Sequence, residues 1–580
     1  MKRLLILFAA LTVSFLVFFS TAAASDGTGS GLYDPIPAGG NQESEGSTPD
    51  ARGGEPGEPG EGNEKSGKSD EEGSEPEVKE LVFALSAGDV NFDPLHAYTA
   101  LESQVYTAIY EGLVTYNPLT LQPMPGVANR WEKSPDGKTY RFYLRDDALY
   151  SNGDQVRAQD FRDNWMRMLD PEADAEYSTF FDIIEGARDY RTGREEDPET
   201  VGIRVISESV LDVELETPAA HFLKLLCHMS FVIVHPHYLE SEEGSEDSLE
   251  ARTSIVGNGP FYVIERSEEK VVLVKNNLYW DRRRVELDRI VLRFYDNPGE
   301  MSLGFNRGDI HWANNWDSGT LEDRSAIVFN PLFATNFFFF KCVDEPWNDH
   351  RVRRAMALLV PWSRIRTDQI FYATDTLVPQ VPDYPEVEGI AEQDRREAMS
   401  LLEEAGYPRG EGLPPIVIRV TAGGDASGVV GIMAEAWRES LETEVEIDQV
   451  SFRQYFASVK RDDFTLGRMT WIGDFADPLT FLQMWTSESN LNDAKYSDTR
   501  YDGMVEKAIP VEGDERYRML AEAEGYLLEQ AVVLPISNQP SVNLIDLDYI
   551  EGWYPNALDI HPFKYLSFKE ARPIPNLVLR

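Results

Sequence analysis

The segment RMTWIGDFADP, residues 468–478, holds several residue types that can do chemistry. It places Arg468, Trp471 and two acids, Asp474 and Asp477, at a predicted strand end followed by a turn. Two carboxylates this close could serve as the acid and base of a hydrolase, although a turn ending in Asp-Pro also explains Asp477 as a cap. A carboxylate beside large aromatic side chains is also suited to binding a cationic group, because a poorly solvated anion gains most from a fixed ammonium partner. Both functions stay open at this point.

Four of the eight histidines lie within 17 residues, at His221, His228, His235 and His237. A metal site is one interpretation, since neutral imidazole is a common metal ligand. The spacings, however, mix i+7 with i+2, and the strand-like apolar residues 231–234 intervene. This pattern favours structural histidines.

The motifs that most directly indicate catalysis are missing from the sequence. It contains no GxSxG, HExxH, phosphate-binding loop or paired CxxC. The GNGP run at 257–260 predicts a tight turn rather than a phosphate loop. Arg351, Arg353 and Arg354 stand beside apolar residues at helical spacing, which predicts a solvated helix face rather than an anion site.

The strands that must position these residues are visible in the hydrophobic pattern. Leu81–Ser86 is apolar, and Thr139–Arg145 alternates apolar with polar residues, as half-buried strands do. Residues 416–451 read as strand, helix and strand, which predicts a parallel βαβ crossover. Val459–Trp471 predicts a further strand. These strands and helices predict a mixed α/β chain, and the sequence has no repeat period.

Two helices have clear ends in the sequence. Apolar residues recur at helical spacing from Asp160 onward, so we expect Asp160 to cap a helix that ends at Asp170-Pro171. Asp394–Ala405 predicts a second helix, which Gly406 stops.

Composition narrows the functional class. The 580 residues include 54 basic and 100 acidic ones, a formal net charge of −46, so binding to nucleic acid or to anionic lipid is not expected. With 42% hydrophobic and 11% aromatic residues, most of the chain must be globular. Two cysteines, Cys227 and Cys342, exclude a disulfide scaffold and a Cys-based zinc cluster, and spacing does not reveal whether they pair.

The first 24 residues have the order of a secretory signal peptide. Lys2 and Arg3 precede an apolar run, Leu4–Phe19, and the small residues Ala22–Ala24 follow. The alternative is an uncleaved anchor, but the run is short for a span of about 20 residues. No lipobox cysteine stands near the cleavage point, so we expect a soluble protein of the periplasm or extracytoplasmic space.

Residues 25–77 have a different composition from the rest of the chain. They are rich in Gly, Pro, Ser and acids, and hold one aromatic residue, Tyr33. Such a stretch buries too little apolar surface to offset the entropy of ordering it, so it predicts a disordered acidic tether.

Several segments together resemble the extracellular solute-binding proteins of family 5, the oligopeptide-binding proteins of ABC importers. The most specific stretch is GVANRWEKSPDGKTYRFYLRDDALYSNGDQVRAQDF, residues 126–161. It is similar to the family's GVAxxW start and WSDGxxVTAxDF continuation, with YSNG in place of WSDG. Further similar motifs follow in family order: FDPL (92–95), YEGL (110–113), NGPFYV (258–263), YWD (279–281), WNDHRVRRAMAL (347–358), LLEEAGYP (401–408) and WIGDFADPLTFL (471–482).

The resemblance implies a two-lobed periplasmic-binding-protein fold of the cluster C type, with an extra domain inserted in the N-terminal lobe. The first lobe would comprise 78–110, 236–332 and 541–580. The inserted domain would be 111–235, and the second lobe 333–540. The lobes would close on an extended peptide.

The resemblance also implies site residues. Asp474 matches the aspartate that pairs with a peptide's α-ammonium group, and Trp471 and Ile472 the flanking strand positions whose backbone pairs with the peptide. The remaining matches are Tyr98 and Ala100 in the facing lobe, Tyr177 near the peptide's amino end, Arg468 in the cleft, and Phe452 where some members have a pocket-lining tryptophan.

The expected function is therefore a monomeric, non-enzymatic receptor that captures oligopeptides and delivers them to an ABC importer permease, with no cofactor. The alternatives are the same fold with another ligand, such as a metal chelate, haem or an oligosaccharide, and an exported hydrolase that uses Asp474 and Asp477. The best-known oligopeptide binders pair two cysteines where this sequence has Ala334 and Ile472, so that bridge is not expected here.

Overall fold

The computed structural model describes residues 78–86, 90–240, 245, 252–367, 372–422 and 428–569, without the side chains of 452 and 453. The predicted signal peptide and tether, residues 1–77, lie outside this range. The chain divides into two units, Met1–Gly73 and Ser74–Arg580, and all of the described residues belong to the second.

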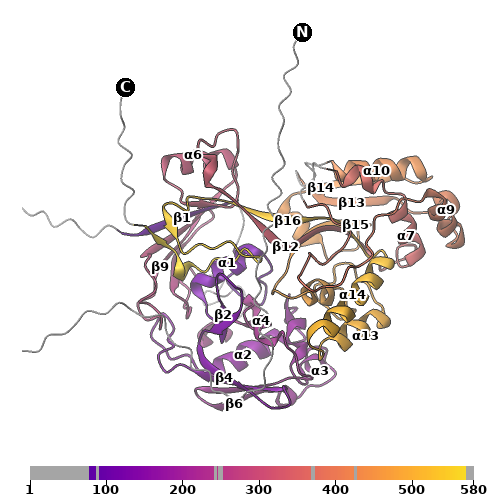
Figure 1. The fold of residues 1–580 in the computed structure, drawn as a ribbon. Helices are drawn as coiled ribbons and strands as arrows, with labels where there is room; N and C mark the ends of the chain where they lie inside the picture. Colours follow the sequence, from indigo (N-terminus) through magenta and orange to yellow (C-terminus); the bar gives the residue numbers. More distant parts are fainter. Residues whose placement is uncertain are drawn as a thin grey trace, which may run out of the picture. The chain divides into compact units, whose positions relative to one another are not determined.

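A ten-stranded mixed sheet forms the centre of the second unit (Figure 1). Its strands lie in the order β14 (Val445–Val450), β13 (Ile416–Thr421), β15 (Leu466–Ile472), β12 (Ile327–Phe340), β16 (Val533–Ile545), β11 (Trp312–Ala313), β1 (Glu80–Ser86), β10 (Arg289–Tyr295), β9 (Lys270–Lys275) and β8 (Phe261–Arg266). The α/β class predicted from the sequence is confirmed.

Two long antiparallel strands, β12 and β16, connect the halves of the sheet. One half, β1 and β8–β11, comes from the chain before residue 314, and the other, β13–β15, from residues 416–472. The register of β12 against β16 shifts between Pro331 and Thr335, so the ladder is interrupted where the two halves meet.

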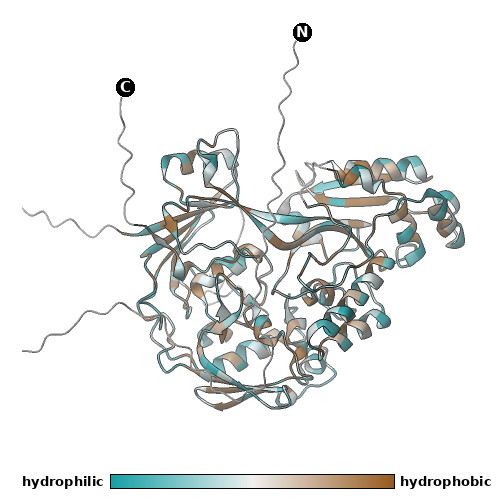
Figure 2. Ribbon diagram, in the orientation of Figure 1, coloured by the Kyte–Doolittle hydropathy of each residue, from teal (hydrophilic) through white to brown (hydrophobic). Residues whose placement is uncertain are grey.

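The centre of the sheet is buried on both faces. The last eight residues of β12 are all buried, and they end in four consecutive phenylalanines, 337–340, each 0% exposed. A strand covered on both sides has a continuous apolar run rather than an alternating one. Figure 2 shows hydrophobic stretches along the strands of this sheet and mixed hydrophilic and hydrophobic residues along the helices.

A second sheet of four strands has the order β4 (Ala128–Lys133), β5 (Thr139–Leu144), β7 (Val210–Glu214) and β6 (Ile203–Ser207), all antiparallel. In this sheet, β5 confirms the strand predicted at Thr139–Arg145 to within one residue. Two-stranded sheets pair β2 (Val114–Tyr116) with β3 (Pro123–Pro125), and β17 (Ile550–Glu551) with β18 (Ser567–Phe568).

The α-helices cover the sheets and connect their strands. They are α1 (Ala100–Ile109), α2 (Ala158–Met168), α3 (Ala187–Arg191), α4 (Phe222–Leu225), α5 (Pro236–Leu239), α6 (Pro298–Arg307), α7 (His350–Leu358), α8 (Trp362–Ile365), α9 (Arg395–Glu404), α10 (Val429–Ser440), α11 (Phe452–Ser458), α12 (Leu479–Leu482), α13 (Thr499–Ala508) and α14 (Gly513–Glu529). No helix in the described part of the chain is long and apolar enough to cross a membrane.

The predicted βαβ unit is present. β13 and β14 pair in parallel from Ile416–Val445 to Thr421–Val450, and α10 connects them. α9 also begins where expected, because the Asp394 side chain accepts hydrogen bonds from the backbone N–H groups of Arg396 and Glu397 at 2.8 and 3.0 Å.

Three local predictions need correction. Arg157, not Asp160, is the N-cap of α2, and Asp160 lies one turn inside, where its carboxylate accepts the Arg157 backbone N–H at 2.9 Å. β15 begins only at Leu466, because residues 459–465 form turns. Arg353 is 2% exposed rather than solvated, since its guanidinium donates to the carbonyls of Trp347 and Gln530.

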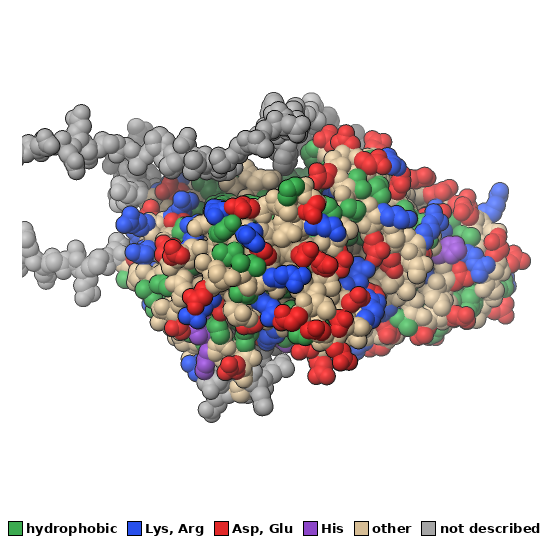
Figure 3. Space-filling model, turned by 90° about the horizontal axis from the view of Figure 1, so that it is seen from below, with side chains coloured by type: hydrophobic (Ala, Val, Ile, Leu, Met, Phe, Trp, Pro, Cys, Tyr) green, Lys and Arg blue, Asp and Glu red, His purple; other side chains and the backbone are tan. Residues whose placement is uncertain are grey.

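The surface charge agrees with the acidic composition, and neither of the two cysteines forms a disulfide. Figure 3 shows acidic side chains spread over one face, with basic ones among them and no basic patch. Cys227 and Cys342 are both free thiols, and Ala334 and Ile472 face each other as register partners of β12 and β15.

Candidate ligand-binding site

A cavity of about 220 Å³ lies where several distant segments meet. The start of α1, the segments around Tyr177 and His228, α11, and the end of β15 with its following turn contribute to the wall. Its lining residues are Tyr98, Thr99, Ala100, Ser103, Tyr177, His228, Met229, Phe456, Met469, Thr470, Trp471, Ile472, Gly473, Asp474, Leu558 and Ile560. The wall is mostly apolar, with one carboxylate in it.

Six of the eight residues predicted from the sequence line this cavity: Tyr98, Ala100, Tyr177, Trp471, Ile472 and Asp474. Arg468 does not, and its Nε donates to Asn336 Oδ1 at 3.1 Å. Phe452 begins α11, but its side chain lies outside the described residues. Phe456, one turn further along, lines the cavity instead.

Aromatic rings form one side of the cavity around Tyr98. The ring centroid of Tyr98 lies 6.1 Å from Tyr177, 5.8 Å from Phe456 and 6.1 Å from Trp471. The first pair is stacked and the other two are edge-to-face, so the rings fix each other's orientation. Phe456 and His228 were not predicted as site residues. The aromatic residues around 452–456 were a signal for Phe456, whereas His228 was interpreted as a structural histidine.

The strand that carries Trp471 and Ile472 has a partly open edge. On one side, β15 pairs with β12 from Leu466 to Ile472. On the other, β13 pairs only with Leu466 and Gly467. Among the described residues, 469–472 therefore have a strand neighbour on one side only, and these four residues line the cavity. Such an edge can pair with an added extended chain.

The Asp474 carboxylate lies at the end of this edge, and its side chain is 6% exposed. Thr480 holds it: the Thr480 hydroxyl donates to Oδ2 at 2.9 Å and accepts the Asp474 backbone N–H at 2.9 Å. The Asp474 carbonyl accepts from the Tyr116 hydroxyl at 3.1 Å. The carboxylate is thus fixed by neutral groups.

Burial raises the pKa of the Asp474 carboxyl to about 7, and the Thr480 and Tyr177 hydroxyls and the Trp471 indole offset this rise only in part. The Trp471 N–H lies close enough to lower the pKa but completes no hydrogen bond. Within the described chain, the one basic side chain within 4.0 Å is His228, whose Nε2 is 3.6 Å from Oδ1. Burial lowers the pKa of His228 to about 3, so this imidazole is neutral. The anion therefore has no cationic partner here.

Asp477, the other acid of the turn, has a different environment. Arg516 donates to both of its oxygens at 2.8 Å, and the two side chains are 7% and 5% exposed. The Arg516 charge and hydrogen bonds outweigh the desolvation of this carboxyl, so the pKa of Asp477 is lowered. Both oxygens of Asp477 are thus occupied by Arg516, and Asp477 does not line the cavity, so it is not placed to act with Asp474 on a bound ligand.

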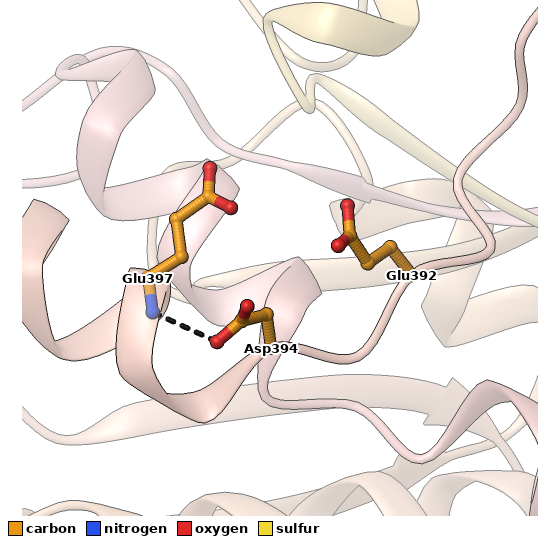
Figure 4. Close-up of side chains that lie close together, drawn as sticks. All are labelled: Glu392, Asp394 and Glu397. Atoms are coloured by element: carbon orange, nitrogen blue, oxygen red, sulfur yellow. Dashed lines mark hydrogen bonds between the residues drawn. The ribbon is translucent and has the colours of Figure 1, made fainter.

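Two of the four clustered histidines cap short helical turns, and one of these two, His228, also lines the cavity. His228 and His235 accept the backbone N–H groups that begin the short helical turns at Met229 and Pro236. Among the described residues, one trio of ligand-type side chains lies close together: Glu392, Asp394 and Glu397 (Figure 4). Asp394 is the N-cap of α9, and acids at a helix N-terminus are stabilised by its partial positive charge.

A larger cavity of about 720 Å³ lies beside η1 (Ser178–Ile183), α3 and α13. Both arginines that line it are paired: Arg188 Nη1 lies 2.6 Å from Glu506 Oε1, and Arg194 Nη1 3.1 Å from Glu488 Oε1. These pairs connect segments 188–194 and 488–506 directly, so their charges are satisfied within the chain.

Comparison with known proteins identifies a family for this chain. Residues 122–493 match the model of the bacterial extracellular solute-binding proteins, family 5. The chain is 27% identical over 489 residues to the periplasmic murein peptide-binding protein MppA of Escherichia coli, covering 81% of this chain and 89% of the other. It is 26% identical to the probable deoxycholate-binding periplasmic protein YgiS of the same organism, covering 80% and 88%.

Solved structures share the fold. The murein tripeptide-binding protein MppA of Escherichia coli superposes with a TM-score of 0.76 at 25% identity, over 85% of this chain and 99% of that one. Its unliganded open form gives 0.59 over 85% and 98%. OppA of Haemophilus influenzae in complex with RPPGFSPFR gives 0.76 at 23% identity, over 85% and 99%. The predicted fold of the binding proteins is therefore confirmed.

Proposed function

This chain belongs to the family-5 bacterial extracellular solute-binding proteins, which bind solutes and are not enzymes, and from that premise we propose that its ligand is a peptide with a free amino terminus. The observation that carries the proposal is the buried Asp474 carboxylate, which has no cationic partner among the described residues. An α-ammonium group placed in the cavity would supply the missing charge.

The open edge of β15 supports a peptide over a small amine. Residues 469–472 would pair with the main chain of the ligand, and Asp474, at the end of that edge, would hold the first amino group. Reading the main chain and the amino end makes recognition independent of most side chains. Trp471, Ile472, Tyr98, Ala100 and Tyr177 would contact the peptide near this end.

Arg468 and Phe452 keep their place in the proposal as residues further from the amino end. Arg468 lies on the same strand but outside the cavity wall. We propose that a longer ligand would extend toward it, since the cavity of about 220 Å³ accommodates only the first residues of a peptide.

The proposed function requires two lobes to close on the ligand. The first lobe would comprise residues 78–110, 236–332 and 541–580, and the second would comprise residues 333–540. The break in the β12–β16 register between Pro331 and Thr335 supports a boundary near residue 332. The lower similarity to the open MppA form, a TM-score of 0.59 against 0.76, supports a closed arrangement of the described chain. A closed, loaded receptor is what a membrane permease of an ABC importer would engage, and export of the protein by residues 1–24 would bring the two together.

The relative named for deoxycholate binding makes a non-peptide ligand the second candidate. Deoxycholate, haem and many metal chelates carry carboxylates, and a second anion beside Asp474 would be repelled in a poorly solvated cavity. An oligosaccharide would leave the Asp474 charge without a partner. The site therefore favours a cationic group over each of these ligands.

Native mass spectrometry of the purified protein, with a synthetic tripeptide library added, tests the proposal. Retention of free-amine peptides, and loss of binding when the same library is N-acetylated, is the expected result. Equal binding of both libraries, or retention of deoxycholate instead of peptides, would overturn it.

A further inference from the structure

His228 meets Asp474 from a distant part of the chain. The histidine begins η3 (Met229–Phe231), whereas Asp474 follows β15, and the two side chains are 5% and 6% exposed. The ring of His228 is held between aromatic neighbours, with centroids 4.5 Å from Tyr177 and 5.1 Å from Phe180. Its orientation is therefore fixed before any ligand arrives.

The hydrogen bonds of His228 assign its tautomer. Nδ1 accepts the backbone N–H of Ser230 at 3.3 Å and contacts the Ser230 hydroxyl at 2.9 Å. Because a backbone N–H can only donate, Nδ1 carries the lone pair, and the proton of the neutral ring is on Nε2. That N–H bond is on the atom 3.6 Å from Asp474 Oδ1.

We propose that His228 is a positioning residue, whose neutral Nε2–H orients and stabilises the Asp474 anion without neutralising it. A lysine or arginine at this place would form a permanent ion pair, as Arg516 does with Asp477, and would compete with the ammonium group of the ligand. A neutral N–H dipole leaves the full charge available. The inference rests on the proposed function and adds a residue that selects for free amines.

Two substitutions test the roles of the two ring nitrogens of His228 separately. His228→Asn keeps an acceptor near the position of Nδ1, and so the cap of η3, but has no group at Nε2. His228→Gln can place an amide N–H near Nε2. The probe is the tightest-binding tripeptide of the library, with and without N-acetylation, and calorimetry gives both affinities for each variant.

We expect His228→Asn to weaken binding of the free-amine tripeptide by about tenfold, as loss of a polar contact to a charged group would. Binding of the N-acetyl form should stay within a factor of two, and His228→Gln should restore most of the free-amine affinity. A merely structural histidine would instead weaken both peptides by the same factor.

The chain offers a matched control in His235. Its Nδ1 accepts the backbone N–H of His237 and so caps α5, and its Nε2 lies 2.9 Å from Asp154 Oδ2. Neither His235 nor Asp154 lines the cavity. His235→Asn should change neither affinity. If wild type prefers the free amine but His228→Asn keeps that preference, the inference is wrong while the proposed function stands. If wild type shows no preference, the proposed function itself fails.

Discussion

Asp477 and Arg516 form a buried bidentate ion pair, with both nitrogen–oxygen distances 2.8 Å. Asp474, three residues earlier in the same turn, is equally buried but has only hydroxyls, the Trp471 indole and a neutral imidazole around its carboxylate. One acid is thus neutralised within the fold and the other is not. This difference assigns Asp477 to stability and leaves Asp474 for a ligand.

Arg516→Leu should lower the free energy of unfolding by roughly 3–5 kcal/mol, because it leaves the Asp477 charge buried without a partner. Denaturant titration of the empty protein measures this value. Arg518→Leu is the control: Arg518 is on the same helix, α14, but pairs with Glu515 and Glu522 at the surface, so its loss should leave stability nearly unchanged. Equal losses for the two variants would contradict the assignment.

In contrast to Arg516→Leu, Asp474→Asn should weaken ligand binding without lowering the stability of the empty protein. It removes an uncompensated buried charge, so the melting temperature of the empty protein should not fall. Affinity for a free-amine tripeptide should fall by two or more powers of ten, because the ammonium group would be buried unpaired, at a cost of roughly 3 kcal/mol or more. Calorimetry with free and N-acetylated peptides isolates the coupling. Unchanged affinity for the free amine would show that the carboxylate does not bind it.

Gly473→Ala should disturb the same turn by steric contact. An added Cβ would lie 2.7 Å from Phe333 Cδ1 and 2.9 Å from Thr480 Cγ2. Overpacking of this kind costs typically about 1–3 kcal/mol and should displace Thr480 from Asp474. We expect weaker peptide binding and a lower melting temperature. Gly503→Ala, in α13, adds a Cβ with no atom within 4 Å of it and should instead stabilise the helix by up to about 1 kcal/mol.

Local elements of this fold could be predicted because their signals are local. The strand–helix–strand pattern at 416–451 and the Asp394 cap depend on residues close in sequence, and the structure has both. The placement of Asp474 in a cavity beside Tyr98 and Tyr177 followed from the family resemblance rather than from periodicity.

Long-range partners could not be predicted from one sequence. Arg353 looks like a surface residue until Trp347 and Gln530 supply buried carbonyls for it. Glu111 of the YEGL motif pairs in the core with Lys564 at 2.9 Å, near the other end of the chain. The contact between His228 and Asp474 is of the same kind, since neither residue has a neighbour in sequence that indicates the other.

Lowering the pH should favour closure of the empty protein, because burial raises the pKa of the Asp474 carboxyl. Its pKa is about 7 in the described structure but near 3.8 where the carboxyl is exposed to water, so closing without a ligand takes up a proton between these values. The closed empty form is therefore most favoured below about pH 4 and loses this advantage as the pH rises to 7. Of the facing groups, the phenols of Tyr98, Tyr116 and Tyr177, with pKa values raised well above 10, are uncharged throughout this window. His228 opposes the Asp474 effect to the extent that opening exposes its ring, because burial lowers its pKa to about 3 and closing then releases a proton.

X-ray scattering of the empty protein at about pH 5 and about pH 7.5 measures this effect as a smaller radius of gyration at the lower pH. Asp493, whose pKa burial raises to about 6, titrates in the same window beside Lys341 and Lys460, so the wild type alone does not assign the effect. In Asp474→Asn the part due to Asp474 disappears, so the difference between the two pH values should shrink to the contribution of Asp493. A saturating free-amine peptide should also remove the difference, because its ammonium group keeps Asp474 ionised in the closed form. If the variant retains the full pH dependence, the charge that opposes empty closure lies on Asp493 and not on Asp474.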